Sequence, residues 1–300
     1  MNCMQKSPVV WMGGKSRIMK HLLPLIPEHK RYVEVFGGSG ALLFTKDPLI
    51  SEIEVYNDLD GGLVHFFRTL RNKEQFAELE RLCSLTVYSR EEWVNARDAL
   101  DAETDPVQRA FLWYVVNRMS FGGRHGGSWG SVTTSCSGPV GNRMAGTAAR
   151  WISGINHLPE FHQRIQRVQI EQQDWKTVLR RYDSPETFFY LDPPYLMSTR
   201  RAGEYAHELT DANHCDLVET ILSLEGKVLL SGYPSDLYKP LLDAGWNYET
   251  IETTCNMVGR VAGSGLKGVG NVKDKQKRTE ALWFNYPIPN QIALHPYSDN

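Results

Sequence analysis

Apolar and polar residues alternate along the first sixty positions in a way that predicts strands and helices in turn. The runs Tyr32 to Phe36 and Ile53 to Asn57 have the apolar and β-branched content of strands. Arg17 to Leu25 has helical spacing and ends before Pro27, and a further helix is predicted to start at Ala41. This order is typical of a parallel sheet whose strands are joined by helices.

The alternation stops after residue 60 and returns near residue 165. Residues 62–100 have helical spacing throughout, and Ala110 to Val116 is a further apolar segment. Later, one helix is predicted from Asp211 to Leu224 with Thr210 as its cap. The later predicted strands are Val168 to Glu171, Phe188 to Leu191, Val228 to Ser231 and Ala281 to Phe284. We therefore expect one α/β domain formed by residues 1–60 and 165–300, interrupted by a second domain over residues 61–164.

The predicted insertion has an unusual composition. Eight of the 25 glycines lie between Gly122 and Gly146, which predicts hairpins and loops, or disorder. Residues 107–170 contain seven arginines, no lysine and one acid, although the whole chain has a net charge of −2. Because arginine binds phosphates and base edges in bidentate geometry, this excess suits nucleic acid, with a solvated basic face as the alternative.

Composition also narrows the class of protein. The 300 residues are 41% hydrophobic and 23% charged, as in an ordinary globular protein. The five cysteines are scattered without C-x-x-C spacing, so neither a disulfide framework nor a zinc site is predicted. No signal-peptide pattern and no apolar run of about 18 residues occurs, so we expect a cytoplasmic protein that binds neither a membrane nor a metal.

The most informative run is Asp192-Pro193-Pro194-Tyr195, which follows a predicted buried strand. A carboxylate at a strand end is held by a rigid element, and the prolines remove backbone N–H groups while leaving carbonyl acceptors. Tyr195 adds a flat face that could stack on a planar substrate. The combination predicts a site for an aromatic amine, with a proline-rich turn and a solvated Asp192 as the alternative.

A glycine-rich turn, Gly37-Gly38-Ser39-Gly40, follows the strand at Tyr32 to Phe36. Glycines let a ligand approach the backbone closely, and the helix that follows offers free N–H groups. Asp58 comes after the next strand, where an acid can accept hydrogen bonds from ribose hydroxyls. An adenosyl cofactor is therefore predicted. The dinucleotide fingerprint is not, because Leu43 stands where its third glycine belongs.

Two rival motifs are weaker. The glycine turn resembles a hydrolase nucleophile elbow around Ser39, but no later histidine lies in a recognisable loop. Gly14-Lys15-Ser16 resembles the end of a phosphate-binding loop, but Val9 occupies the position of that loop's first glycine. Neither a hydrolase nor an ATPase is favoured.

Several ordered motifs resemble the Dam-type family, the α group, of adenine-specific DNA methyltransferases. They are Trp11-Met12-Gly13-Gly14-Lys15, Glu34-x-Phe36-x-Gly38-x-Gly40, Tyr56-Asn57-Asp58 and Asp192-Pro193-Pro194-Tyr195. The resemblance implies a Rossmann-like methyltransferase sheet with an inserted, mainly helical plus hairpin target-recognition domain. It also implies S-adenosyl-L-methionine as the methyl donor and double-stranded DNA as the partner.

The resemblance assigns roles to single residues. Those implied to bind the cofactor are Trp11, Gly13, Lys15, Glu34, Phe36, Gly38, Gly40, Asp58, Asp174, Trp175 and Asp192. Lys15 would lie near the methionine carboxylate and Asp58 would hold the ribose. Asp174 and Trp175 would lie around the adenine ring of the cofactor.

The same resemblance makes Asp192, Pro193, Pro194 and Tyr195 the catalytic motif. Asp192 and the carbonyl of Pro193 would accept the two hydrogens of the adenine amine, which favours a nitrogen with a more available lone pair. Tyr195 would stack on the adenine after it leaves the duplex. The chain has no Pro-Cys dipeptide, which argues against methylation at cytosine C-5.

DNA contacts are expected from the insertion and from a basic loop over residues 260–278. The candidates are Asn117, Arg118, Arg124, His125, Arg260, Lys267 and Lys273. The recognition segment departs from the family pattern, so the target sequence is open. Methylation of a cytosine amine, methylation of RNA adenine, and nucleic-acid binding without turnover also stay open.

Overall fold

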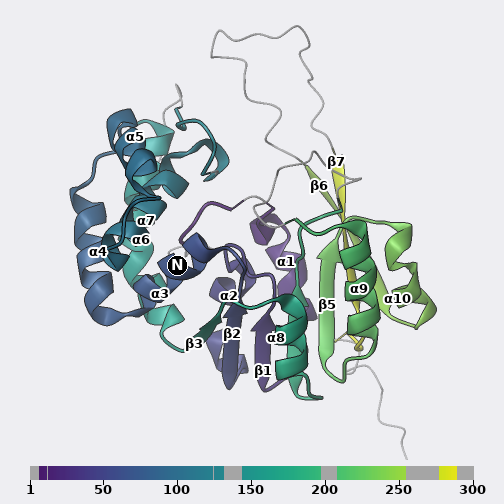
Figure 1. Cartoon of the computed structure of the whole chain (residues 1–300). Coiled ribbons are helices and arrows are strands. Elements are labelled where there is room, and N and C mark those ends of the chain that lie inside the picture. Colours follow the sequence, from purple (N-terminus) through teal and green to yellow (C-terminus); the bar gives the residue numbers. More distant parts are fainter. Residues whose placement is uncertain are drawn as a thin grey trace, which may run out of the picture.

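The computed structural model describes residues 7–11, 13–123, 125–131, 144–196, 208–254 and 277–288 (Figure 1). These residues form a seven-stranded sheet in the order β3-β2-β1-β4-β5-β7-β6. The strands are β1 (Arg31–Glu34), β2 (Ile53–Asn57), β3 (Val168–Glu171), β4 (Thr187–Leu191), β5 (Lys227–Gly232), β6 (Asn247–Thr254) and β7 (Lys277–Phe284). The predicted α/β class is confirmed.

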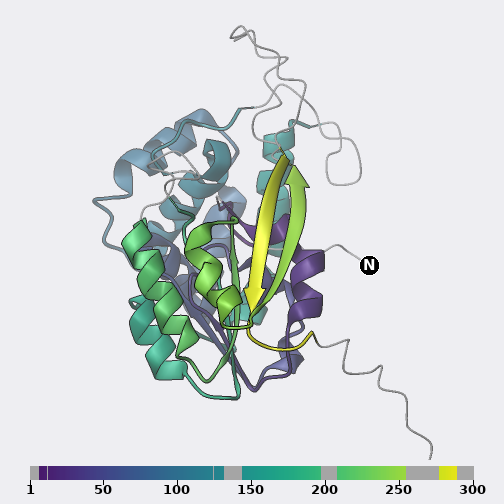
Figure 2. The ribbon, with the colours of Figure 1, turned by 90° about the vertical axis from the view of Figure 1, so that its right-hand side faces the viewer.

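Strands β1 to β5 pair in parallel, whereas β7 is antiparallel to both β5 and β6. Figure 2 shows β6 and β7 side by side at one edge of the sheet. Because β1, β2, β4 and β5 run in the same direction, the loops that follow them meet at one edge. In open sheets of this kind, ligands bind outside the carboxyl ends of the strands.

Side chains that alternate along each strand build a separate core on each face of the sheet. Phe188 and Tyr190 of β4 point to the face covered by α1 (Met19–Leu22) and α2 (Ala41–Thr45). Phe189 and Leu191 point to the face covered by α8 (Trp175–Tyr182), α9 (Asp211–Leu222) and α10 (Lys239–Asp243). The two-residue period of a strand explains this division.

The segment between β2 and β3 is helical and lies beside the β3 edge (Figure 1). Its helices are α3 (Gly61–Arg71), α4 (Lys73–Leu85), α5 (Arg90–Ala99), α6 (Pro106–Met119) and α7 (Gly146–Ile165). Its core continues into the sheet, because Phe67 of α3 lies edge-on to Tyr56 of β2 at 4.9 Å between ring centroids. Phe66 in turn stacks on Tyr114 of α6 at 5.0 Å. That this segment recognises the DNA target stays a prediction.

Three features differ from the predicted elements. The helix predicted over residues 62–100 is divided into three, because the side chains of Asn72 and Ser89 cap new helices. Strand β6 and helix α7 were not predicted. Of β6, only Ile251 is among the buried hydrophobic residues, and α7 contains Gly154 and Pro159.

No helix in the described part of the chain is long and apolar enough to cross a membrane.

Candidate active site

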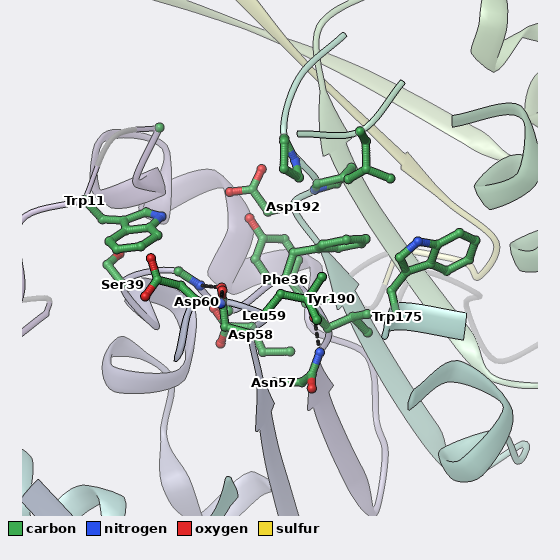
Figure 3. Close-up of a pocket in the computed structure, with 18 of the residues that line it drawn as sticks. Trp11, Phe36, Ser39, Asn57, Asp58, Leu59, Asp60, Trp175, Tyr190 and Asp192 are labelled. Atoms are coloured by element: carbon green, nitrogen blue, oxygen red, sulfur yellow. Dashed lines mark hydrogen bonds between the residues drawn. The ribbon is translucent and has the colours of Figure 1, made fainter. Parts of the chain in front are cut away.

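A cavity of about 250 Å³ opens at the carboxyl ends of β1, β2 and β4 (Figure 3). It is lined by twelve of the residues predicted from the motifs: Trp11, Gly13, Lys15, Glu34, Phe36, Gly38, Asp58, Asp174, Trp175, Asp192, Pro193 and Pro194. In Figure 3, Trp11 and Trp175 lie at opposite ends of the group, with Phe36 and Asp192 between them. The sheet thus brings together motifs that are far apart in the sequence.

The glycine turn forms the floor beneath Trp11. Gly38 has a φ of +49°, and a Cβ atom at this position would lie 2.7 Å from Nε1 of Trp11. A side chain is therefore excluded by both conformation and space. Gly40 does not line the cavity: its φ of +64° starts α2, and a Cβ there would lie 2.9 Å from the ring of Phe44. Its role is in the backbone turn instead of ligand contact.

Asn57, the last residue of β2, and Asp58, the residue after it, hold the backbone at and around the glycine turn. Oδ2 of Asp58 accepts a hydrogen bond from the Gly38 N–H at 2.7 Å, and Oδ1 accepts from the Asp60 N–H at 2.8 Å. Asn57 is buried and donates to the Val35 carbonyl at 2.9 Å. Its amide oxygen accepts from the Gln173 N–H at 2.8 Å. Asp58 thus ties the glycine turn to the loop that follows β2.

Asp192 lies just beyond β4, and one of its two carboxylate oxygens, Oδ1, is held by an ion pair and a hydrogen bond. Lys15 Nζ lies 2.6 Å from Oδ1 of Asp192, and the Ser231 hydroxyl of β5 donates to the same oxygen at 2.9 Å. In the described part of the chain Oδ2 takes no protein hydrogen bond, so this oxygen is available to a ligand. Lys15 also donates to the Gly13 carbonyl and to the Tyr195 hydroxyl, which uses all three of its donors.

Tyr195 is buried and held at its hydroxyl. The hydroxyl accepts from Lys15 at 2.5 Å and donates to Oε2 of Glu280 at 2.7 Å. Lys15 Nζ is 4.6 Å from the ring centroid, which puts the ammonium at the hydroxyl end of the ring instead of over its face. Tyr233 packs on the ring at 4.2 Å between centroids. Base stacking by Tyr195 stays a prediction.

The proline turn has its own support from α9. His214, which is fully buried, hydrogen-bonds through Nε2 to the Pro194 carbonyl at 3.0 Å. Its Nδ1 lies 2.9 Å from the Tyr238 hydroxyl. Both ring nitrogens are thus occupied, which fixes the imidazole and the turn that it holds.

Glu34 is a buried carboxyl in the lining of the cavity. Burial raises its pKa to about 8, with a smaller contribution from the charge of Asp192. Hydrogen bonds from the Tyr32 hydroxyl and the Leu43 N–H act in the opposite direction. Near neutral pH in the ligand-free protein, Glu34 is therefore largely protonated and contributes little negative charge.

Comparison with known proteins decides which family this geometry belongs to. The chain matches the family of D12 class N6 adenine-specific DNA methyltransferases over residues 11–257. It belongs to that family. The reaction of this methyltransferase is the methylation of adenine in DNA, and the resemblance stated from its motifs is confirmed.

Individual relatives of the methyltransferase are distant. It is 27% identical over 276 residues to the type II methyltransferase M1.LlaDCHI of Lactococcus lactis subsp. cremoris, covering 85% of this chain and 92% of that protein. It is 23% identical over 208 residues to a DNA adenine methylase of Vibrio cholerae serotype O1, covering 67% and 70%. A 121-residue match of 28% identity to the DNA N-6-adenine-methyltransferase of Escherichia phage P1 covers 40% of this chain and 16% of that protein.

Four residues of the methyltransferase site were not singled out from the sequence. They are Ser231 on β5, Tyr233 just after it, His214 on α9 and Glu280 on β7. Glu280 directly precedes the predicted strand Ala281 to Phe284, but nothing in the sequence shows that β7 lies next to β5. The sequence signal for Ser231 and Tyr233 is their place at the end of a predicted strand.

The predicted DNA contacts at the end of α6 need correction. Asn117 is fully buried, and its amide group hydrogen-bonds the Val10 N–H and carbonyl at 2.9 and 2.8 Å. It cannot reach a base edge in this fold, so that prediction is wrong. Arg118 donates to the carbonyls of Arg150 at 2.5 Å and Pro8 at 3.4 Å, so its guanidinium also serves the fold.

His125 packs its ring on Trp113 at 4.9 Å between centroids, and its Nε2 is buried. Burial lowers the pKa of this imidazole, which favours the neutral form. A direct contact between His125 and DNA stays a prediction. Arg124, Arg260, Lys267 and Lys273 lie outside the described residues.

Proposed function

We propose that this chain transfers the methyl group of S-adenosylmethionine to the exocyclic amine of an adenine that has left the DNA duplex. The observation that carries the proposal is the position of Asp192. Its carboxylate is fixed at Oδ1 by Lys15 and Ser231 and lines the same cavity as the glycine turn and Asp58. A fixed acceptor beside a nucleoside-sized cavity is what the methylation of an amine requires.

The residues around the cavity fit an adenosyl cofactor. Gly38 leaves room for close approach to the backbone, and the carboxylate of Asp58 lines the same cavity, as an acceptor for ribose hydroxyls would. Trp175 lies at the far end of the cavity, where its ring could pack on an adenine. All three donors of Lys15 are already used, so binding a carboxylate there requires Lys15 to release one of its present partners. S-adenosylmethionine supplies an activated methyl group when bound.

The residues beyond β4 would prepare the amine. Oδ2 of Asp192 and the Pro193 carbonyl can each accept one N–H, which holds the nitrogen with its lone pair directed at the methyl carbon. Moving an adenine out of the duplex costs about a few kcal/mol of stacking and pairing free energy. Contacts between the protein and other parts of the DNA must supply this free energy. The relatives named for the methylation of DNA adenine support DNA as the substrate, and the duplex is the form that we propose.

Substitution of Asp192 tests this proposal. Asp192→Asn keeps the size of the side chain but replaces one acceptor oxygen by a donor, so methyl transfer should fall by roughly 100-fold or more. The measurement is incorporation of labelled methyl groups into unmethylated duplex DNA, followed by identification of the methylated base.

The matched control is Asp236→Asn, an exposed aspartate in the turn after β5. It should leave the rate unchanged. A near-normal rate in Asp192→Asn, or label on a base other than adenine, would refute the proposal.

A further inference from the structure

A continuous hydrogen-bonded chain leads out of the cavity from Asp192. Lys15 Nζ lies 2.6 Å from Oδ1 of Asp192 and donates to the Tyr195 hydroxyl at 2.5 Å. Tyr195 then donates to Oε2 of Glu280 at 2.7 Å. The chain therefore starts at the end of β4 and ends at a second carboxylate on β7, beside the β6 edge of the sheet (Figure 2).

The burial of its members suits the transfer of a proton. Lys15 is 5% exposed and Tyr195 is 7% exposed, so bulk water has little access to the middle of the chain. Glu280 is half-buried, which places the end of the chain nearer to solvent than its middle. Two hydrogen bonds of the chain already point away from Asp192: Lys15 donates to Tyr195, and Tyr195 donates to Glu280.

The other branch from Asp192 offers no exit in the described part of the chain. Ser231 donates to Oδ1 and shares a 3.2 Å hydrogen bond with the Tyr190 hydroxyl. Burial raises the pKa of Tyr190 well above its usual value, and both residues lie inside the sheet. This branch can orient the carboxylate, but it does not lead to a base.

The reaction produces a proton that needs an acceptor, and this step rests on the proposed function. As the adenine nitrogen bonds to the methyl carbon, the carbon–sulfur bond of the donor breaks and its electron pair stays on sulfur. The amine nitrogen then carries a positive charge and must lose one N–H proton to Oδ2 of Asp192. Because that charge develops during the transfer, the ability of Asp192 to take the proton enters the rate.

We propose that Glu280 receives this proton through Lys15 and Tyr195. Tyr195 passes its hydroxyl proton to Glu280 and takes one from Lys15. The protonated Asp192 carboxyl turns about its Cβ–Cγ bond, so that Oδ2 takes the place of Oδ1 beside Lys15, and Lys15 takes the proton from it. Asp192, Lys15 and Tyr195 regain their starting protonation states, and the net change is one proton on Glu280. Glu280 does not touch the substrate; it acts as a positioning residue and a proton acceptor at the end of the chain.

The substitution Glu280→Gln separates the two roles. The glutamine oxygen can still accept the Tyr195 hydrogen bond, but the amide cannot take a proton. The single-turnover rate of methyl transfer from the preformed cofactor complex to duplex DNA should fall at least tenfold. The affinity for S-adenosylmethionine, measured by calorimetry, should stay within twofold of the wild type. Added formate should restore part of the rate in Glu280→Ala, because a small carboxylate can occupy the space of the missing side chain.

The matched control is Glu252→Gln. Glu252 lies on β6 and accepts a hydrogen bond from the hydroxyl of Thr279, the residue before Glu280. Glu252→Gln therefore removes a carboxylate from the same hairpin without touching Tyr195. It should leave the rate unchanged. A wild-type rate in Glu280→Gln overturns the proposal, as does an equal loss in both variants or a parallel loss of cofactor affinity. If the wild type itself fails to methylate DNA, the proposed function is at fault instead.

Discussion

Glu34 shows how a single buried group couples the cavity to pH. Its carboxyl is enclosed on β1 and has a pKa of about 8, compared with 4.5 for an ordinary glutamate. Between these two values the unfolded chain releases this proton while the folded protein retains it. The free energy of unfolding must therefore decrease as pH rises through this window and level off above it.

Substituting Glu34 by glutamine tests that linkage. The amide oxygen can still accept hydrogen bonds from Tyr32 and Leu43, but no proton is exchanged. We expect the melting temperature of the ligand-free wild type to decrease from pH 5 to pH 8, and that of Glu34→Gln to decrease by several degrees less. The measurement is a set of thermal melts across this range. Two parallel curves would contradict the raised pKa.

At the scale of elements, the segment of residues 7–11 joins the glycine turn to helix α6. Asn117 of α6 holds both backbone groups of Val10, and the Ser7 hydroxyl donates to the Ser39 carbonyl at 2.7 Å. A Cβ on Gly123, which has a φ of +76°, would collide with the Val10 carbonyl. Trp11 therefore reaches the glycine turn from a segment that α6 and the loop after it hold in place.

Removal of the Asn117 side chain should loosen Trp11. Asn117→Ala leaves the Val10 N–H and carbonyl without their partner, which costs about 1–3 kcal/mol of stability. We also expect a weaker affinity for S-adenosylmethionine, by roughly tenfold for each 1.4 kcal/mol that the positioning of Trp11 contributes. Calorimetry and thermal melts measure the two effects.

A matched asparagine distinguishes positioning from general destabilisation. Asn247 of β6 donates to the Tyr286 carbonyl at 2.8 Å, far from the cavity in the sheet order. Asn247→Ala should reduce stability without changing cofactor affinity. If both variants bind the cofactor equally well, the clamp on Val10 does not position Trp11.

The elements that the sequence predicted well are those with a local signal. Phe188 to Leu191 of β4 is an unbroken buried run of apolar and aromatic residues, which predicts a central strand, and Thr210 forms the cap predicted for α9. Helix α7 was missed because Gly154 and Pro159 are poor helix formers. In the fold, Gly154 leaves space for the Arg118 guanidinium, which would lie 2.5 Å from a Cβ at this position and would have to shift.

Some contacts of the site depend on the order of the strands in the sheet, and the sequence does not predict that order. The motifs identified Asp192 and Lys15, because residue types in a fixed spacing carry that information. Ser231 contacts Asp192 only because β5 lies beside β4. Glu280 contacts Tyr195 only because β7 lies beside β5. Neither adjacency has a local signal, and the same is true of Asn117, whose partner Val10 lies 107 positions earlier in the chain.

At the scale of the whole molecule, a buried ionic cluster ties the helical segment back to the sheet. Glu54 of β2 is 1% exposed and binds Lys46 at 2.5 Å and Arg164, near the end of α7, at 2.6 Å. Arg164 also donates to the Leu43 carbonyl at 2.8 Å. Because of this cluster and the aromatic contacts of α3, we expect the helical segment and the sheet to unfold as one cooperative unit.

Neutralising Glu54 should therefore destabilise both parts together. Glu54→Gln leaves the charges of Lys46 and Arg164 buried without their carboxylate, which costs about 3–5 kcal/mol. In urea unfolding, the change should appear as a lower midpoint of a single transition. Glu186→Gln breaks the exposed pair with Lys30 and should shift the urea midpoint far less than Glu54→Gln does, because solvent screens exposed charges. Separate transitions for helices and sheet in Glu54→Gln, or a loss no larger than in the control, would show that the cluster does not join them.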